Sequence, residues 1–98
     1  MRKLIWSKRA LNSYEKILDY VEKESIQNAE KIALEILQKV KYAVIHPDFY
    51  SRDKYKVENP KGSFRAFEIH HIRVSIYFDE KVIRVVRIRN TKRKPLKY

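Results

Sequence analysis

Residues 64–77 read FRAFEIHHIRVSIY, and this stretch decides what kind of fold the chain can form. Apolar and polar side chains alternate over 72–78, which is the period-two pattern of a strand with one buried face. Residues 64–69 form a second strand, in which Arg65 shares its parity with Phe67 and Ile69 and is expected at the strand's entry. The pair His70-His71 between them is short and polar, as a hairpin turn requires. The stretch therefore predicts an antiparallel hairpin that buries one aliphatic face.

Other strands are expected on both sides of this hairpin. Residues 82–89 (VIRVVRIR) form a third strand after it, and 54–58 (KYKVE) alternate and could form another before it. The stretch 59–63 (NPKGS) reads as a turn that contains the chain's only glycine. Residues 2–6 (RKLIW) read as a short strand at the N-terminus.

The alternation also predicts which side chains share a face of the sheet. In 72–78, the face that helices would cover carries Ile72, Val74, Ile76 and Phe78, and the other face carries Arg73, Ser75 and Tyr77. In 82–89, strict alternation places Val82, Arg84, Val86 and Ile88 on one face and Ile83, Val85, Arg87 and Arg89 on the other. We expect the face with Arg73 to be open, or partly covered by another chain.

Two amphipathic helices precede the hairpin. The first begins at Lys8 after the N-cap residue Ser7, and its helical periodicity fades near Glu24-Ser25. The apolar positions of the two helices are Leu11, Tyr14, Ile17, Leu18 and Val21, then Ala29, Ile32, Ala33, Ile36, Leu37, Val40 and Val44. The second helix ends at His46, because a residue before proline is driven out of the helical region. A break of a few residues predicts an antiparallel helical hairpin.

The predicted order is β-α-α-β-β-β, which is an α+β fold. It consists of an N-terminal strand, an antiparallel helical hairpin and a three- to four-stranded antiparallel sheet. The 98 residues suffice for one domain, 1–98, and the stretch 90–98 (NTKRKPLKY) reads as a basic C-terminal tail.

Composition excludes several classes of chemistry. The chain has no cysteine, so it has no disulfide, no thiolate nucleophile and no cysteine-bound zinc. Adjacent histidines without a clear third ligand do not make a metal site, and we expect no cofactor. No apolar run approaches the ~20 residues that span a bilayer, so the expected protein is soluble and cytoplasmic, without a membrane partner.

Charge is concentrated in the second half of the chain. Residues 1–49 contain nine Lys/Arg and seven Asp/Glu, a balance of +2, whereas 50–98 contain fourteen and five, a balance of +9. Together they account for the net charge of +11. A field this one-sided favours a nucleic acid, an anionic membrane or an acidic protein partner.

Two stretches carry a resemblance to a known family. The first is WSKRALNSYEKILDYVEKESIQNAEKIALEILQKVKYAVIHP, and the second is FRAFEIHHIRVSIYFDEKVIRVVRIRNTKR. In their order and spacing they resemble the RelE/ParE toxins of type II toxin–antitoxin systems. That family has two activities on one scaffold. RelE-type toxins cut mRNA in the ribosomal A site, and ParE-type toxins poison DNA gyrase.

The resemblance to RelE implies a set of site residues. Arg73 matches the arginine that acts on the scissile phosphate, and Arg65 matches a basic residue of the preceding strand. Arg93 and Tyr98 resemble the family's C-terminal catalytic segment. Further cations would bind the substrate, namely Lys54, Lys56, Arg87, Arg89, Lys92 and Lys94.

The chemistry of metal-free RNA cleavage needs more than cations. The 2′-hydroxyl must lose a proton, and the leaving 5′-oxygen must gain one. Candidates for the base are Glu68, His70, His71 or a lysine with a lowered pKa. The chain departs from the RelE pattern by having Phe67 where many members carry a second lysine, and by lacking a His-Tyr end.

Three functions are therefore open. The first is a ribosome-dependent mRNA endoribonuclease that inhibits translation, and the alternative is a ParE-like gyrase inhibitor without nuclease activity. The third is a basic binding module that acts only in DNA-bound repression. The nuclease hypothesis depends on Arg73, because a guanidinium locked in an internal ion pair would favour a toxin acting through protein–protein contact.

Either toxin implies an antitoxin. We expect it to be an acidic, partly disordered chain that folds on binding and neutralises the cationic face. The family resemblance further implies a free toxin that is monomeric and a complex that is a heterotetramer.

Overall fold

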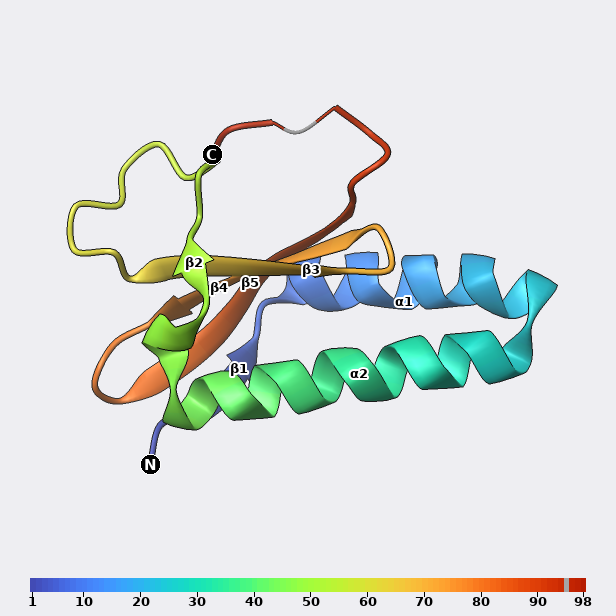
Figure 1. Cartoon of the computed structure of the whole chain (residues 1–98), viewed down its shortest axis with the longest axis horizontal. Coiled ribbons are helices and arrows are strands. Elements are labelled where there is room, and N and C mark those ends of the chain that lie inside the picture. Colours follow the sequence, from blue (N-terminus) through green and yellow to red (C-terminus); the bar gives the residue numbers. More distant parts are fainter. Residues whose placement is uncertain (95) are drawn as a thin grey trace.

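The protein is described here by a computed structural model, and the described residues are 1–94 and 96–98. The elements are β1 (Lys3–Trp6), α1 (Lys8–Glu24), α2 (Ile26–Ile45), the 3₁₀ helix η1 (Pro47–Phe49), β2 (Ser51–Arg52), β3 (Phe64–Ile69), β4 (Ile72–Phe78) and β5 (Val82–Asn90). The α+β class, the N-terminal strand and the helical hairpin are confirmed (Figure 1).

The five strands form one sheet in the order β1-β5-β4-β3-β2. The expected antiparallel sheet is made by β2 to β5, and β1 adds to its far edge in parallel with β5. A parallel pair needs a long crossover between its strands, and the helical hairpin is part of the chain that separates β1 from β5. Figure 1 shows the two helices running side by side across the sheet.

Serine side chains define where the helices begin. The Ser7 hydroxyl accepts a hydrogen bond from the backbone N–H of Ala10 at 3.1 Å, and Ser25 does the same for Asn28 at 3.1 Å. Both serines have extended backbone dihedrals, as N-cap residues do.

Within the described part of the chain, neither helix combines the length and the hydropathy that crossing a bilayer requires.

The core lies between the helices and one face of the sheet. Four of its sheet residues, Val74, Ile76, Ile83 and Val85, have no exposed surface. They pack with the buried stripe of α2, which consists of Ala29, Ile32, Ile36, Val40, Ala43 and Val44. All of these α2 residues except Ala43 are positions that the helical period predicts as core. The prediction is wrong for Leu37 and Leu11, which are 37% and 41% exposed, and Ala33 is only half-buried.

A bulge in β5 changes the predicted faces of that strand. Ser75 pairs with Arg87 and Ile76 pairs with Val85, so Val86 has no partner. The extra residue shifts the alternation by one. Ile83, Val85 and Ile88 therefore all reach the core, whereas Arg84, Arg87 and Arg89 share the opposite face. Strict alternation is wrong for this strand.

The segment before β3 also differs from the prediction. Residues 54–58 do not form a strand, and the strand that pairs with β3 is the two-residue β2. The backbone N–H of Asp53 still bonds to Phe64 O at 2.9 Å, after which the chain leaves the sheet. The turn before β3 contains Gly62 at φ +69°, where a side chain would be strained.

Candidate functional site

Arg73 lies on the sheet face opposite the helices, and that face is not open. Its Nη2 donates to Oδ1 of Asp53 at 2.8 Å, and its Nη1 donates to Oε2 of Glu68 at 2.8 Å. Only 8% of the Arg73 side chain is exposed. The expectation of an open face is therefore wrong, because the chain covers it with its own residues.

Asp53 is the buried carboxylate of this network, and its side chain is fully covered. Besides Arg73, it accepts hydrogen bonds from the Tyr98 hydroxyl at 2.5 Å and from the Tyr55 backbone N–H at 3.1 Å. Burial by itself would raise the pKa of Asp53, but hydrogen bonds from Tyr98, Arg73 and Tyr55 outweigh burial, and the pKa lies below its ordinary value. Asp53 is therefore ionised and balances the buried guanidinium.

Tyr98 is fixed to the body of the protein. Its backbone N–H bonds to Tyr55 O at 2.8 Å, and its carbonyl oxygen accepts from the Val57 N–H at 2.7 Å. Burial and the hydrogen bond to Asp53 raise the pKa of the Tyr98 hydroxyl. Figure 1 shows the C-terminal end lying beside the loop that follows β2. A phenol with a raised pKa that donates to a carboxylate is a structural hydrogen-bond donor in this state.

A layer of cations and aromatic rings covers the rest of this face. Arg73 and Arg89, which are directly opposite on β4 and β5, lie 4.8 and 5.9 Å from the Tyr55 ring. Arg87 lies 4.7 Å from the Tyr98 ring. The remaining contacts join Lys54 to Tyr55, and Lys56 to both Phe64 and Tyr98. We call this set, Lys54, Lys56, Arg73, Arg87, Arg89, Tyr55 and Tyr98, the cation–aromatic layer.

The structure thus brings together six of the residues predicted for the site. Burial lowers the pKa of Arg87, and the positive charge of the neighbouring Arg89 lowers it further, because the two cations lie close together. Each ring offers its face to a guanidinium or ammonium group, and such contacts are worth about 0.5–2 kcal/mol. The aromatic rings and Asp53 therefore hold together charges that would otherwise repel one another.

Arg65 does not belong to this layer. In β3 it shares a face with Phe67, which lies in the core, whereas Glu68 pairs with Arg73 on the opposite face. The Arg65 side chain donates to three backbone carbonyls, Gly62 O at 2.7 Å, Tyr50 O at 3.0 Å and Asp48 O at 3.3 Å. Arg65 and Arg73 therefore cannot contact the same phosphate, and Arg65 fastens η1 to the turn before β3.

The basic residues after β5 are exposed. Lys92, Arg93 and Lys94 lie on the surface, and the backbone beside them is tied down by Arg89 and Arg87. Arg89 donates to Arg93 O at 3.3 Å, and Arg87 donates to Leu96 O at 2.6 Å. The described residues of the expected tail are thus folded back on the sheet, and Lys92 and Lys94 remain exposed.

The candidate bases are placed apart from one another. Glu68 forms an ion pair with Arg73. His70 lies at the hairpin turn, where its Nε2 is 2.6 Å from Oε2 of Glu35 on α2. His70 and His71 both have positive φ, 48° and 63°, which is the backbone of a tight two-residue turn. The predicted turn is confirmed, and Glu68 is the one of these three acid or histidine candidates that contacts a member of the cation–aromatic layer, where it is paired with Arg73.

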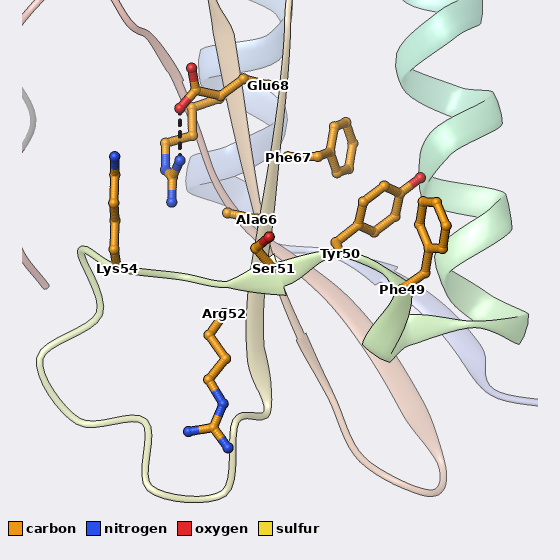
Figure 2. Close-up of a pocket in the computed structure, with 9 residues that line it drawn as sticks. Phe49, Tyr50, Ser51, Arg52, Lys54, Ala66, Phe67 and Glu68 are labelled. Carbon is orange, nitrogen blue, oxygen red and sulfur yellow. Dashed lines mark hydrogen bonds and ion pairs between the residues drawn. The ribbon is translucent and has the colours of Figure 1, made fainter.

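A cavity of about 480 Å³ opens where β2 meets β3. It is lined by Phe49, Tyr50, Ser51, Arg52, Lys54, Ala66, Phe67, Glu68 and Arg73. Figure 2 shows the rings of Phe49, Tyr50 and Phe67 gathered on one side of β2 and the Lys54 side chain on the other. The cavity therefore offers apolar surface next to cations.

Sequence reasoning missed the residue that organises the site. Asp53 stands in the basic stretch SRDKYK, and a lone acid among three cations was the available signal. The alternation instead predicts a strand over 54–58, which gives Asp53 no buried position. Tyr55, which lies inside that stretch, was missed for the same reason.

Residues 4–95 match the family described as the ParE toxin of the type II toxin–antitoxin system parDE. The chain belongs to the ParE toxin family. This confirms the resemblance to RelE/ParE toxins and identifies the protein as a toxin component of such a system. No curated protein matches the chain.

A solved structure has the same fold as this ParE-family chain. It is a chromosomal ParDE toxin–antitoxin system from P. aeruginosa, with a TM-score of 0.69 and 22% sequence identity. The match covers 92% of this chain and 96% of the other. At this identity the likeness concerns the fold alone.

Proposed function

We propose that this ParE-family toxin inhibits DNA gyrase through protein–protein contact and does not cleave RNA. The single observation that carries the proposal is the internal ion pair of Arg73 with Asp53 and Glu68. A toxin of this kind would act in the cytoplasm, where gyrase and DNA are found.

Cleavage of mRNA on the ribosome would require a different arrangement. Arg73 would have to leave two carboxylates before it could bind a phosphate, and separating a buried ion pair costs about 3–5 kcal/mol. Arg65 lies on the other face of the sheet, and the Tyr98 hydroxyl already donates its hydrogen bond to Asp53. The cations of the layer favour an anionic partner in general, which acidic protein segments satisfy as well as RNA.

The partner that keeps this toxin inactive would be an acidic antitoxin. Lys92, Arg93 and Lys94 are exposed beside the cation–aromatic layer, and the cavity near β2 adds apolar surface. A disordered acidic segment could therefore gain both charge pairing and apolar burial as it folds on this face. Such binding would weaken as salt concentration rises.

The proposal is tested by a short pulse of expression in bacteria, with an SOS reporter and mapping of mRNA 5′ ends. We expect SOS induction and filamentation with intact mRNA, and inhibition of supercoiling by purified gyrase when the purified chain is added. Cleavage inside translated codons without SOS induction would overturn the proposal.

Tyr98→Phe separates the two activities further. Phenylalanine keeps the ring that stacks on Arg87 and removes only the hydroxyl. A nuclease that uses this hydroxyl for proton transfer would lose cleavage by orders of magnitude. A gyrase inhibitor would keep its activity at temperatures where the variant is folded, as checked by circular dichroism.

A further inference from the structure

Helix α2 has two apolar sides, and the fold uses only one of them. The first side is the buried stripe described above. The second side carries Ile26, Leu34, Leu37 and Ile45, whose exposed fractions are 61%, 58%, 37% and 60%. Figure 1 shows α2 along the outer margin of the fold. Large aliphatic side chains that remain this exposed in a row mark an interaction surface.

The exposed side is a single regular stripe. Its members are Ile26, Glu30, Leu34, Leu37, Lys41 and Ile45, all of them exposed. Their spacings of 4, 4, 3, 4 and 4 residues keep them on one side of the helix, within an arc of about 100°. We call these six residues the α2 seam. Between Ile26 and Ile45 it runs ~28 Å along the helix.

The α2 seam is complementary to itself when two copies run antiparallel. A two-fold axis between Leu34 and Leu37 sets Leu34 against Leu37 of the second copy. One turn further out, the same axis sets Glu30 against Lys41, and at the ends it sets Ile26 against Ile45. Every opposed pair is either aliphatic with aliphatic or acid with base. A two-fold interface requires such self-complementarity of one patch.

We propose that the α2 seam docks against the α2 seam of a second copy and makes the free toxin a homodimer. This inference goes beyond the proposed function and does not depend on gyrase. It replaces the monomer that the family resemblance implied. An acidic partner helix fits less well, because the seam carries one acid and one base: such a helix could pair with Lys41, but it would face like charge at Glu30. Helix α1 offers no equivalent, since its large exposed apolar residues are only Leu11 and Tyr20 among the described residues.

Sedimentation equilibrium of the purified full chain tests the dimer. The measurement should be made at about 0.3 M salt, because salt screens the repulsion between two chains that each carry a charge of +11. We expect a monomer–dimer equilibrium at micromolar concentrations. Leu34→Lys should raise the dissociation constant of the dimer about tenfold or more, because the Leu34–Leu37 contact occurs twice in a two-fold dimer and both contacts are lost. Tyr20→Lys is the matched control. It removes a similarly exposed apolar side chain from α1 and should leave the dissociation constant of the dimer unchanged.

Charge exchange tests the register. Glu30→Lys alone and Lys41→Glu alone should each weaken the dimer, because like charges then face each other across the interface. The double variant restores both pairs and should restore the dissociation constant to within about threefold. All of these positions are exposed, so circular dichroism and the urea midpoint should confirm that each variant is folded.

A cross-link gives a second measurement in a chain that has no cysteine. The variant with Ile26→Cys and Ile45→Cys should form a covalent dimer under mild oxidation. The variant with Ile26→Cys and Tyr42→Cys should not, because Tyr42 is exposed on a different side of α2. A chain that sediments only as a monomer, or charge variants that fail to compensate, would overturn the proposal. So would protection of the α2 seam by an antitoxin without any dimer.

Discussion

The Tyr98 hydroxyl donates a hydrogen bond to Oδ2 of Asp53, a residue 45 positions earlier in the chain. This contact closes the last segment over a face of the sheet that carries Arg73, Arg87 and Arg89. Because the other Asp53 oxygen accepts from Arg73, one buried carboxylate connects the C-terminal segment to the centre of β4. The stability of the whole face therefore depends on this carboxylate.

Asp53→Asn should destabilise the protein strongly. The substitution keeps the size of the side chain but leaves the Arg73 guanidinium buried without its full counter-charge. We expect a loss of about 3–5 kcal/mol in the free energy of unfolding, measured by urea denaturation. The matched control is Glu68→Gln, whose side chain is 48% exposed and whose pair should be worth at most about 1 kcal/mol. Equal losses for the two variants would contradict this reading of the network.

The protein should lose stability in acid through the same residue. The folded pKa of Asp53 lies below its unfolded value, so the contribution is fully present above the unfolded pKa of about 3.9 and is lost as pH falls through the folded pKa. Unfolding measured between about pH 5 and pH 2 should show a steeper decline for the parent chain than for Asp53→Asn. Identical slopes would show that Asp53 does not change its pKa on folding.

Tyr98→Phe should cost less and should act at the opposite end of the pH scale. Loss of a hydrogen bond to a charged acceptor predicts a decrease of about 2 kcal/mol. Because folding raises the Tyr98 pKa, the hydroxyl stabilises the protein fully below about pH 10 and stops doing so as pH rises toward the folded pKa. Thermal unfolding at increasing alkaline pH should therefore decline less in the variant than in the parent.

Arg65→Ala should behave as a structural variant. The guanidinium joins the carbonyls of Gly62, Tyr50 and Asp48, so its removal should lower the free energy of unfolding by about 2 kcal/mol. Arg84→Ala, an exposed arginine of β5, should change it by less than about 0.5 kcal/mol. Loss of toxicity by Arg65→Ala at full stability would instead point to a direct role in the activity.

His71→Gly should stabilise the hairpin turn. His71 has φ 63°, a left-handed conformation that costs a residue with a side chain free energy and costs glycine little. We expect a net gain of about 0.5–1 kcal/mol, measured as a higher urea midpoint. Glu80→Gly, in the turn between β4 and β5 where φ is not positive, should be neutral or destabilising. A gain at both positions would contradict this explanation, because glycine at a negative φ adds only entropy to the unfolded chain and should not stabilise the fold.

The sequence by itself determined the elements whose pattern is local. The helix start at Ser7, the end of α2 before Pro47 and the hairpin around His70-His71 follow from capping, from proline sterics and from alternation. These features depend on residues a few positions apart. They fix the α+β class without any knowledge of the tertiary structure.

Only the tertiary structure decided what the polar face of the sheet does. Whether Arg73 is free or paired depends on Asp53, 20 residues away, and on Tyr98, 25 residues away on the other side. The bulge at Val86 moved Arg87 and Arg89 to that face, against the strict alternation of the strand. A buried cation must find its counter-charge wherever the fold provides one. Such a choice depends on distant residues that meet in space, which no local pattern records.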